Sequence, residues 1–317
     1  MALEGNRRSD ADIEKKGRNV NVRALYFRHA EKASGIAGSG SEISSSLISP
    51  RGRMQSESLG AHLAKLSVPG EHGTKIRSSL QPRTRETADA MVGAYRTPAD
   101  IERFRARPRI ELSSDTQPKD FLALYIKKWE AEKNKIMAKL GIDPKNFSEL
   151  TPKEQAEIAE PSEIPVAEEW LNDPESEIAR LFPLEKAAAQ LAVLVRRDAR
   201  SATRLKSGSS VDLFNNTHRT MTEPLLMRIM RFKDGGKPQK LADIGGLLGL
   251  NDGFELRTKT DQEGVPMTKL IMYRVKNREL DLPEYEQTEY DVDMKELDRL
   301  ADFGLDLKRQ KADAERS

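Results

Sequence analysis

Four side chains that could carry chemistry share one sequence context, since each lies shortly after a stretch with the composition of a buried strand. They are Arg28, His29, Arg83 and His218. An arginine donates paired hydrogen bonds to phosphoryl oxygens and keeps its charge at any physiological pH. A neutral imidazole can attack phosphorus and form a phosphohistidine that water then hydrolyses. The set therefore predicts phosphoryl transfer, with His29 as the nucleophile and the other three as ligands of the phosphoryl group.

The stretches before these side chains predict strands that bring them together. Val22–Phe27 is apolar and aromatic, as in a strand of a parallel sheet that is buried on both faces. Weaker patterns at Thr74–Ser78, Arg107–Leu112 and Ser210–Asn215 predict three further strands. Ligands of open α/β sheets bind at the carboxyl ends of the strands. We therefore expect the four side chains to meet at that edge, together with Asp115, which follows the third strand.

Helical patterns alternate with the predicted strands. Ser49 and Pro50 have the residue types preferred at the N-cap and at the first position of a helix. The stretches 84–95 and 184–205 also have helical composition. This alternation predicts an α/β fold with three layers, in which helices flank a mostly parallel sheet.

Outside this alternation, differences in composition divide the chain into a leader, a domain with an inserted cap, and a tail. Residues 1–20 are polar and unpatterned, which predicts a flexible leader, and 21–317 is expected to form a single α/β domain. From about 116 to 184 the pattern is purely helical, so we expect a helical cap inserted into that domain. The stretch 254–275 predicts a C-terminal β-hairpin, and a charged tail is expected from about 308.

The bulk composition narrows the class of protein. With 53 basic and 51 acidic residues, the chain has no overall charge that would attract nucleic acid or an anionic membrane. The absence of cysteine excludes disulfides, thiolate metal sites and a cysteine nucleophile. No apolar run is long enough to span a membrane. We expect a cytoplasmic protein with no metal, cofactor, nucleic acid or membrane partner, and the sequence does not indicate its oligomeric state.

Taken in order, the motifs resemble the histidine phosphatase superfamily, in its phosphoglycerate mutase-like branch. Tyr26–Glu31 is similar to the family's strand-ending Arg-His-Gly-Glu signature, Leu47–Gly60 to its next helix, and Ser79–Ala88 to the segment that supplies a second arginine. His218 matches the second histidine of the family. The resemblance implies that His29 is phosphorylated, while the two arginines and the second histidine hold the phosphate.

Two positions depart from the family pattern. Ala30 replaces the usual glycine, and Arg219 replaces the glycine that commonly follows the second histidine, where it could add a charge to the pocket or point away. The resemblance implies a general acid in the loop after the third strand, and Asp115 is the nearest fit. The alternatives that stay open are Glu111, Glu168 and Glu169.

These observations predict a phosphomonoester hydrolase that acts through a phosphohistidine on His29. Its substrate is expected to be a phosphorylated small molecule or a phosphoprotein, which the sequence does not identify. Two alternatives stay open: a phosphoglycerate mutase-type phosphoryl transfer, and a non-catalytic phosphate-binding or scaffold protein of the same fold. The cap is the expected source of substrate choice, because such folds vary in the loops over a fixed catalytic edge. His62 and His72 are expected to be structural.

Overall fold

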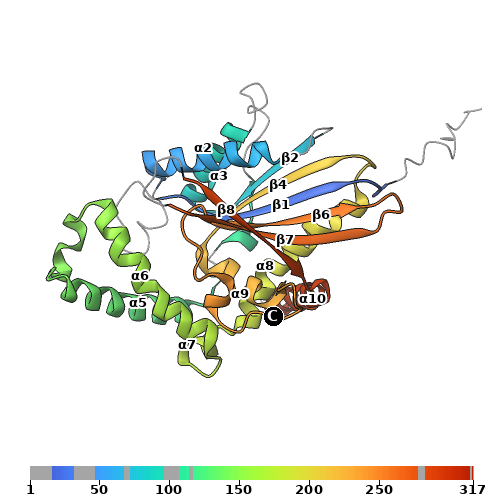
Figure 1. Cartoon of the computed structure of the whole chain (residues 1–317). Helices are drawn as coiled ribbons and strands as arrows, with labels where there is room; N and C mark the ends of the chain where they lie inside the picture. Colours follow the sequence, from blue (N-terminus) through green and yellow to red (C-terminus); the bar gives the residue numbers. More distant parts are fainter. Residues whose placement is uncertain are drawn as a thin grey trace, which may run out of the picture.

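The computed structural model describes residues 16–31, 47–67, 72–95, 107–113, 117–277, 283–314 and 316. Within these ranges the strands form one eight-stranded sheet in the order β3-β2-β4-β1-β6-β7-β8-β5 (Figure 1). The strands are β1 (Asn21–Arg28), β2 (His72–Ser78), β3 (Arg107–Pro108), β4 (Ser210–Thr217), β5 (Met230–Arg231), β6 (Gly253–Thr260), β7 (Pro266–Val275) and β8 (Tyr285–Val292). The predicted strands that end at the candidate site are therefore neighbours in space.

In the parallel half of the sheet, the pairing register determines where each strand ends relative to its neighbours. β1 pairs with β4 so that Arg28 lies opposite Thr217, and β2 pairs with β4 so that Ser78 lies opposite Asn216. All three strands thus reach the same edge within one residue of one another. Residues that directly follow them must lie close together, as the sequence predicted.

The prediction of a mostly parallel sheet is wrong for the second half. β6 pairs antiparallel with β1, β7 with β6, β8 with β7, and β5 with β8. Between β6 and β7, the Asp261 carboxylate accepts hydrogen bonds from the backbone N–H groups of Glu263 and Val265. A connection this short can join only antiparallel strands, whereas a parallel pair needs a long crossover.

The third predicted strand is also shorter than expected. Only Arg107–Pro108 pairs with β2, and Ile110–Leu112 turns into a 3₁₀ helix. Pro108 has no N–H group to donate to a continued ladder, so the strand ends there. The turn that follows buries Leu112 completely.

Helices cover both faces of the sheet (Figure 1). The described α-helices are α2 (Pro50–Lys65), α3 (Pro82–Tyr95), α5 (Lys119–Lys139), α6 (Pro152–Asn172), α7 (Glu177–Leu181), α8 (Leu184–Ala199), α9 (Arg219–Ile229) and α10 (Met294–Ala314). The Ser49 hydroxyl caps α2 by accepting a hydrogen bond from the Gly52 N–H group, as predicted. Residues 308–314, within the predicted charged tail, are helical and continue α10.

Strand β1 lies between two hydrophobic cores, which explains why its sequence is mainly apolar. On one face Leu25 and Phe27 pack into a core with residues of α2 and α3. On the other face Val22, Ala24 and Tyr26 pack into a larger core with residues of α8, α9 and α10. Successive side chains of a strand point to opposite faces, so every position of β1 before Arg28 is buried.

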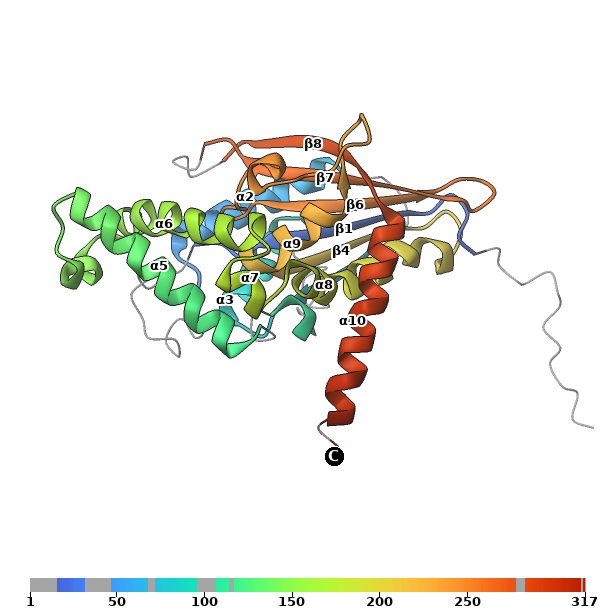
Figure 2. The same ribbon diagram turned by 90° about the horizontal axis from the view of Figure 1, so that it is seen from below.

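The helices α5 and α6 extend beside the end of the sheet at which β1 ends, in both views of the molecule (Figures 1 and 2). An aromatic cluster attaches them to the body of the protein. Phe121 of α5 lies 4.8 Å from the Trp170 ring of α6 and 5.1 Å from Phe182, measured between ring centroids. The helices of the predicted cap are therefore held next to the candidate site.

A buried carboxylate ties the parallel strands to α8. The Asp198 side chain accepts hydrogen bonds from the Tyr26 hydroxyl of β1 at 2.8 Å and from Arg77 Nη1 of β2 at 2.6 Å. The same Arg77 nitrogen donates to Asn215 Oδ1 of β4 at 3.1 Å. All four side chains are buried, so one charged group fixes three strands below the site.

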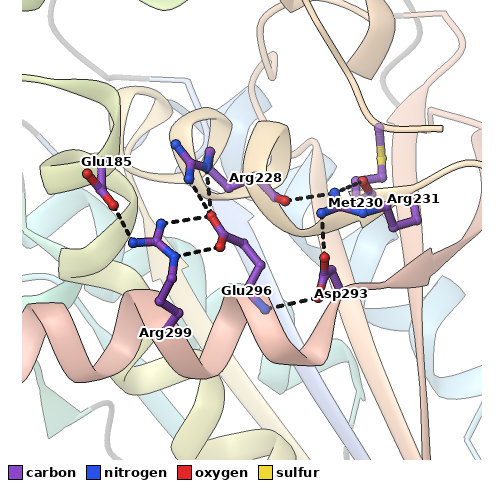
Figure 3. Close-up of polar contacts among 7 residues, drawn as sticks. All are labelled: Glu185, Arg228, Met230, Arg231, Asp293, Glu296 and Arg299. Atoms are coloured by element: carbon purple, nitrogen blue, oxygen red, sulfur yellow. Dashed lines mark hydrogen bonds and ion pairs between the residues drawn. The ribbon is translucent and has the colours of Figure 1, made fainter. Parts of the chain in front are cut away.

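Ion pairs hold the first turn of α10 against α9 (Figure 3). Glu296 accepts hydrogen bonds from Arg299 and from Arg228, the latter at 2.5 Å from Nη2, and Asp293 accepts from Arg231 at 2.5 Å. Hydrogen bonds from Arg299 and Arg228 outweigh the effect of burial and lower the pKa of Glu296 to about 2. The folded protein therefore favours the charged form of this side chain.

We expect Glu296→Gln to lower the melting temperature at pH 7 by roughly 2–4 °C, the equivalent of about 1 kcal/mol after allowance for solvent screening. The pKa of Glu296 is lower in the folded than in the unfolded chain, so this contribution is complete above about pH 4.5 and is lost as the pH falls toward 2. Thermal melts followed by circular dichroism should show the difference from wild type shrinking between pH 5 and pH 3. The exposed Glu289→Gln is the control, and a difference that does not change with pH would contradict the ionic origin.

Candidate active site

Backbone hydrogen bonds extend the strand pairing into the residues of the site. The His29 N–H group donates to Thr217 O at 3.1 Å, and the Ser79 N–H group donates to Asn216 O at 3.1 Å. As a result the rings of His29 and His218 lie 5.3 Å apart, centroid to centroid, at an interplanar angle of 62°. Both histidines are 5% exposed. The structure therefore brings together two side chains that are 189 positions apart in the sequence.

The protonation state of His29 follows from its surroundings. Its Nδ1 lies 2.8 Å from Ala30 O, and because a carbonyl oxygen only accepts, Nδ1 carries the proton and Nε2 keeps its lone pair. Burial lowers the pKa of this imidazole well below its usual value, and electrostatic interactions with Arg83, His218 and Arg28 lower it further. His29 is thus a neutral base, surrounded by the charged residues that the sequence singled out.

A relay of hydroxyl groups orients His218. Its Nε2 lies 2.8 Å from Ser79 Oγ, which lies 2.8 Å from Thr84 Oγ1. The Thr84 hydroxyl donates its hydrogen bond to Gln81 O at 2.7 Å, so it accepts one from the Ser79 hydroxyl. The Ser79 hydroxyl in turn accepts a hydrogen bond from His218. Nε2 of His218 is therefore protonated, and the ring is held by the segment that precedes α3. The sequence placed Ser79 in a family-like motif but assigned it no role.

Arg28 is positioned by a loop that the sequence did not single out. Its Nη1 donates to Leu248 O at 3.0 Å, and its backbone N–H group donates to Asp252 O at 2.9 Å. The Leu248 N–H group donates to the fully buried carboxylate of Glu223 at 3.0 Å. The loop 245–252, between α9 and β6, thus fixes the first arginine of the site.

Arg83 lies in the first turn of α3 and is 5% exposed. Thr87, one turn further, connects it to the nucleophile: its hydroxyl donates to Arg83 O at 2.7 Å and accepts from the Ala30 N–H group at 3.0 Å. Both α3 and α9 begin at this edge of the sheet, so the positive ends of their dipoles add to the charge of the arginines. This arrangement favours an anion between the helices.

Small residues allow α2 to approach the segment that follows β1. A Cβ atom on Gly52 would lie 2.7 Å from Glu31 O, and one on Gly60 would lie 1.9 Å from Met91 O of α3. The Ser49 hydroxyl donates to the Glu31 carboxylate at 3.0 Å. These contacts give a physical reason for the glycines of the Leu47–Gly60 motif. Ala30, which replaces the family's usual glycine, is fully buried here.

The structure gives a divided answer for the predicted general acids. Asp115 lies outside the described residues, and so does the side chain of Arg219. Glu111 is paired with Lys308 of α10 at 3.1 Å, and Glu169 is paired with Lys128 of α5 at 2.9 Å. The ion pairs engage these two carboxylates with lysines of other helices, while Glu168 is exposed on the surface of α6.

The remaining histidines are of less chemical interest. His62 lies on α2 against the rings of Tyr273 and Tyr285, at 6.4 Å and 5.2 Å between centroids, so its role is packing. The side chain of His72 is outside the described set. Among the side chains that the structure describes, no group of three or more histidine or acidic residues could hold a metal ion. None of the described helices is long and apolar enough to cross a membrane.

Comparison with known proteins identifies the fold but no near relative. No family model matches the chain, and no curated protein matches it in sequence. Among solved structures, the Hafnia alvei phytase superposes with a TM-score of 0.52 at 10% identity, covering 92% of this chain and 97% of the phytase. A Klebsiella phytase gives 0.48 at 13% identity, covering 90% and 95%. A Bacillus anthracis phosphoglycerate mutase gives 0.38 at 14% identity, covering 80% and 93%.

The first of these similarities extends over nearly the whole of both chains, so it applies to the complete arrangement of sheet and helices. At 10% sequence identity, this similarity shows a shared fold and nothing about function. The chain therefore has the fold of the Hafnia alvei phytase over nearly its whole length. The motifs around His29, Arg83 and His218 resemble those of the histidine phosphatase superfamily, from the order of residues in the sequence.

Proposed function

We propose that the protein is a phosphomonoester hydrolase that works through a phosphohistidine on His29. The observation that carries the proposal is the state of that side chain: a buried neutral imidazole, with Nδ1 bonded to Ala30 O and a lone pair on Nε2. An isolated core histidine has no need of cationic neighbours. Here Arg83, His218 and Arg28 are close enough to act on its pKa, which suits a site built for an anion.

The reaction follows from these positions. Nε2 of His29 attacks phosphorus, and the bond between phosphorus and the leaving oxygen breaks as that oxygen takes a proton from an acid. Water then attacks the phosphohistidine, the bond from phosphorus to Nε2 breaks, and inorganic phosphate leaves. The guanidinium groups and His218 stabilise the charge that spreads over the phosphoryl oxygens in both transition states, at no cost of reorganisation.

The substrate is proposed to be a phosphorylated small molecule or a phosphoprotein. The four predicted phosphate-site residues are all present in the sequence, which favours an enzyme over a non-catalytic scaffold. Hydrolysis is preferred over a mutase reaction because a mutase must retain its product for a second transfer, and no described feature is specific to that step.

The covalent intermediate gives the first test. We expect His29→Ala to lower kcat/KM on p-nitrophenyl phosphate by at least about 10³-fold, since no other group can replace the nucleophile. Rapid alkaline quenching of the wild type with labelled substrate should trap a phosphoprotein that is stable in alkali and loses its label on later exposure to acid. His62→Ala is the matched control and should keep wild-type activity. Equal turnover by His29→Ala and wild type would refute the mechanism.

The pH dependence gives the second test. Because the pKa of His29 lies well below its usual value, the ring stays neutral and nucleophilic at pH values where an exposed histidine is already protonated. We expect its NMR signals, assigned by comparison with His29→Ala, not to titrate between pH 7 and pH 6. In Arg83→Met the pKa should rise, because a neighbouring positive charge is gone. The exposed Arg85→Met on the same helix is the control, and an unchanged titration in Arg83→Met would contradict the electrostatic account.

A further inference from the structure

A cavity of about 750 Å³ lies next to the phosphate-binding arginine, between α6 and the loop 245–252. The loop side of this cavity includes Leu247 and Leu250, next to the Leu248 carbonyl that holds Arg28. The side formed by α6 includes Glu157, Glu160 and Ile164. The cavity therefore joins the predicted cap to the catalytic edge of the sheet.

The periodicity of α6 explains which of its side chains reach the cavity. Ile158, Ala159 and Ser162 are buried on the side that packs against the protein. Residues 157, 160 and 164 follow one another at spacings of three and four, so they share another face of the helix. Of these, Glu160 lies nearest to the chemistry, with Oε1 3.8 Å from Arg28 Nη1.

Three further carboxylates of this region hold neighbouring groups of the structure, while Glu157, the other glutamate of α6 that lines the cavity, is exposed. Asp252 accepts hydrogen bonds from the Gly249 and Val275 N–H groups, at 2.7 and 2.9 Å. Glu223 accepts from the Leu248 N–H group, and Glu31 accepts from the Ser49 hydroxyl. Asp252, Glu223 and Glu31 each have a structural role, and the first two are at most 1% exposed. The Glu160 side chain is 32% exposed and lines the cavity, where a leaving group can meet it.

We propose that Glu160 is the general acid of the reaction, supplied by the inserted helices instead of by the loop after the third strand. The proposal rests on the proposed hydrolase function. A phosphoryl group bound to Arg28 places its leaving oxygen within a few ångströms of the Glu160 carboxyl group. A rotation of the Glu160 side chain brings the carboxyl group into hydrogen-bond distance of that oxygen.

Substrate binding also prepares this group to act as an acid. In the structure, Arg28 and Glu160 face each other as an ion pair. A phosphoryl group that binds Arg28 takes over the guanidinium, so the Glu160 carboxyl group meets the leaving oxygen beside it. The Oε–H bond then breaks as the leaving oxygen takes the proton and separates from phosphorus. In the second step the carboxylate accepts a proton from the attacking water, which restores the acid.

The test is the dependence of rate on the leaving group. Loss of a general acid strongly slows the release of an alkoxide leaving group. It slows the release of p-nitrophenolate only slightly, because that group leaves readily without a proton. We expect Glu160→Gln to lower kcat/KM on alkyl phosphates by about 10²–10⁴-fold and on p-nitrophenyl phosphate by less than about 10-fold. Trapped phosphohistidine should still form from p-nitrophenyl phosphate. Glu160→Asp should recover part of the activity on alkyl phosphates, which a lost packing contact would not explain.

Controls distinguish a failure of the Glu160 assignment from a failure of the proposed hydrolase function. Glu130→Gln, an exposed carboxylate of α5 in the same insertion, should behave as wild type on every substrate. Asp115→Asn is measured in parallel. If Asp115→Asn shows the selective loss on alkyl phosphates and Glu160→Gln does not, Glu160 is not the acid and the hydrolase function stands. If the wild type forms no phosphohistidine and hydrolyses none of the substrates, the proposed function fails as well.

Discussion

The buried carboxylate of Asp198 is the interaction on which the position of the site depends. It binds Tyr26 of β1 and Arg77 of β2, and Arg77 also binds Asn215 of β4. A buried charge is tolerated only when it is paired, and removal of one partner typically costs about 3–5 kcal/mol. The network therefore favours a single arrangement of the three strands. His29, Ser79 and His218 are the next residues along these strands, so the alignment of the strands becomes the alignment of the catalytic groups.

The site combines a neutral histidine with several positive groups, a combination that is unfavourable without an anion. Burial and nearby arginines keep the pKa of His29 low, so the nucleophile needs no base to activate it. The same arginines keep their charge in this environment because guanidinium is a strong base. In the proposed reaction a phosphoryl group satisfies the positive groups and reacts with the neutral one, so that one electrostatic arrangement accounts for both binding and attack.

The sheet has two halves that serve the site in different ways. The parallel half carries the nucleophile and the second histidine. The antiparallel half begins at the same edge, where the loop 245–252 and the start of β6 hold Arg28 through Leu248 O and Asp252 O. The inserted helix α6 closes the cavity from the other side. The aromatic cluster attaches this helix to the body of the protein, and its Glu160 lies 3.8 Å from Arg28.

The sequence alone determined the order of the chemical residues and the local elements before them, because these depend on short-range patterns. The apolar run before Arg28, the Ser49 cap and the motif around Arg83 all act within one turn or one strand. Tertiary structure decided the antiparallel half of the sheet, the Ser79 relay to His218 and the approach of Glu160 to Arg28. Glu160 is 132 positions from Arg28, and one helical glutamate among many has no local signal. Only tertiary packing brings side chains so distant in the sequence within a few ångströms of one another.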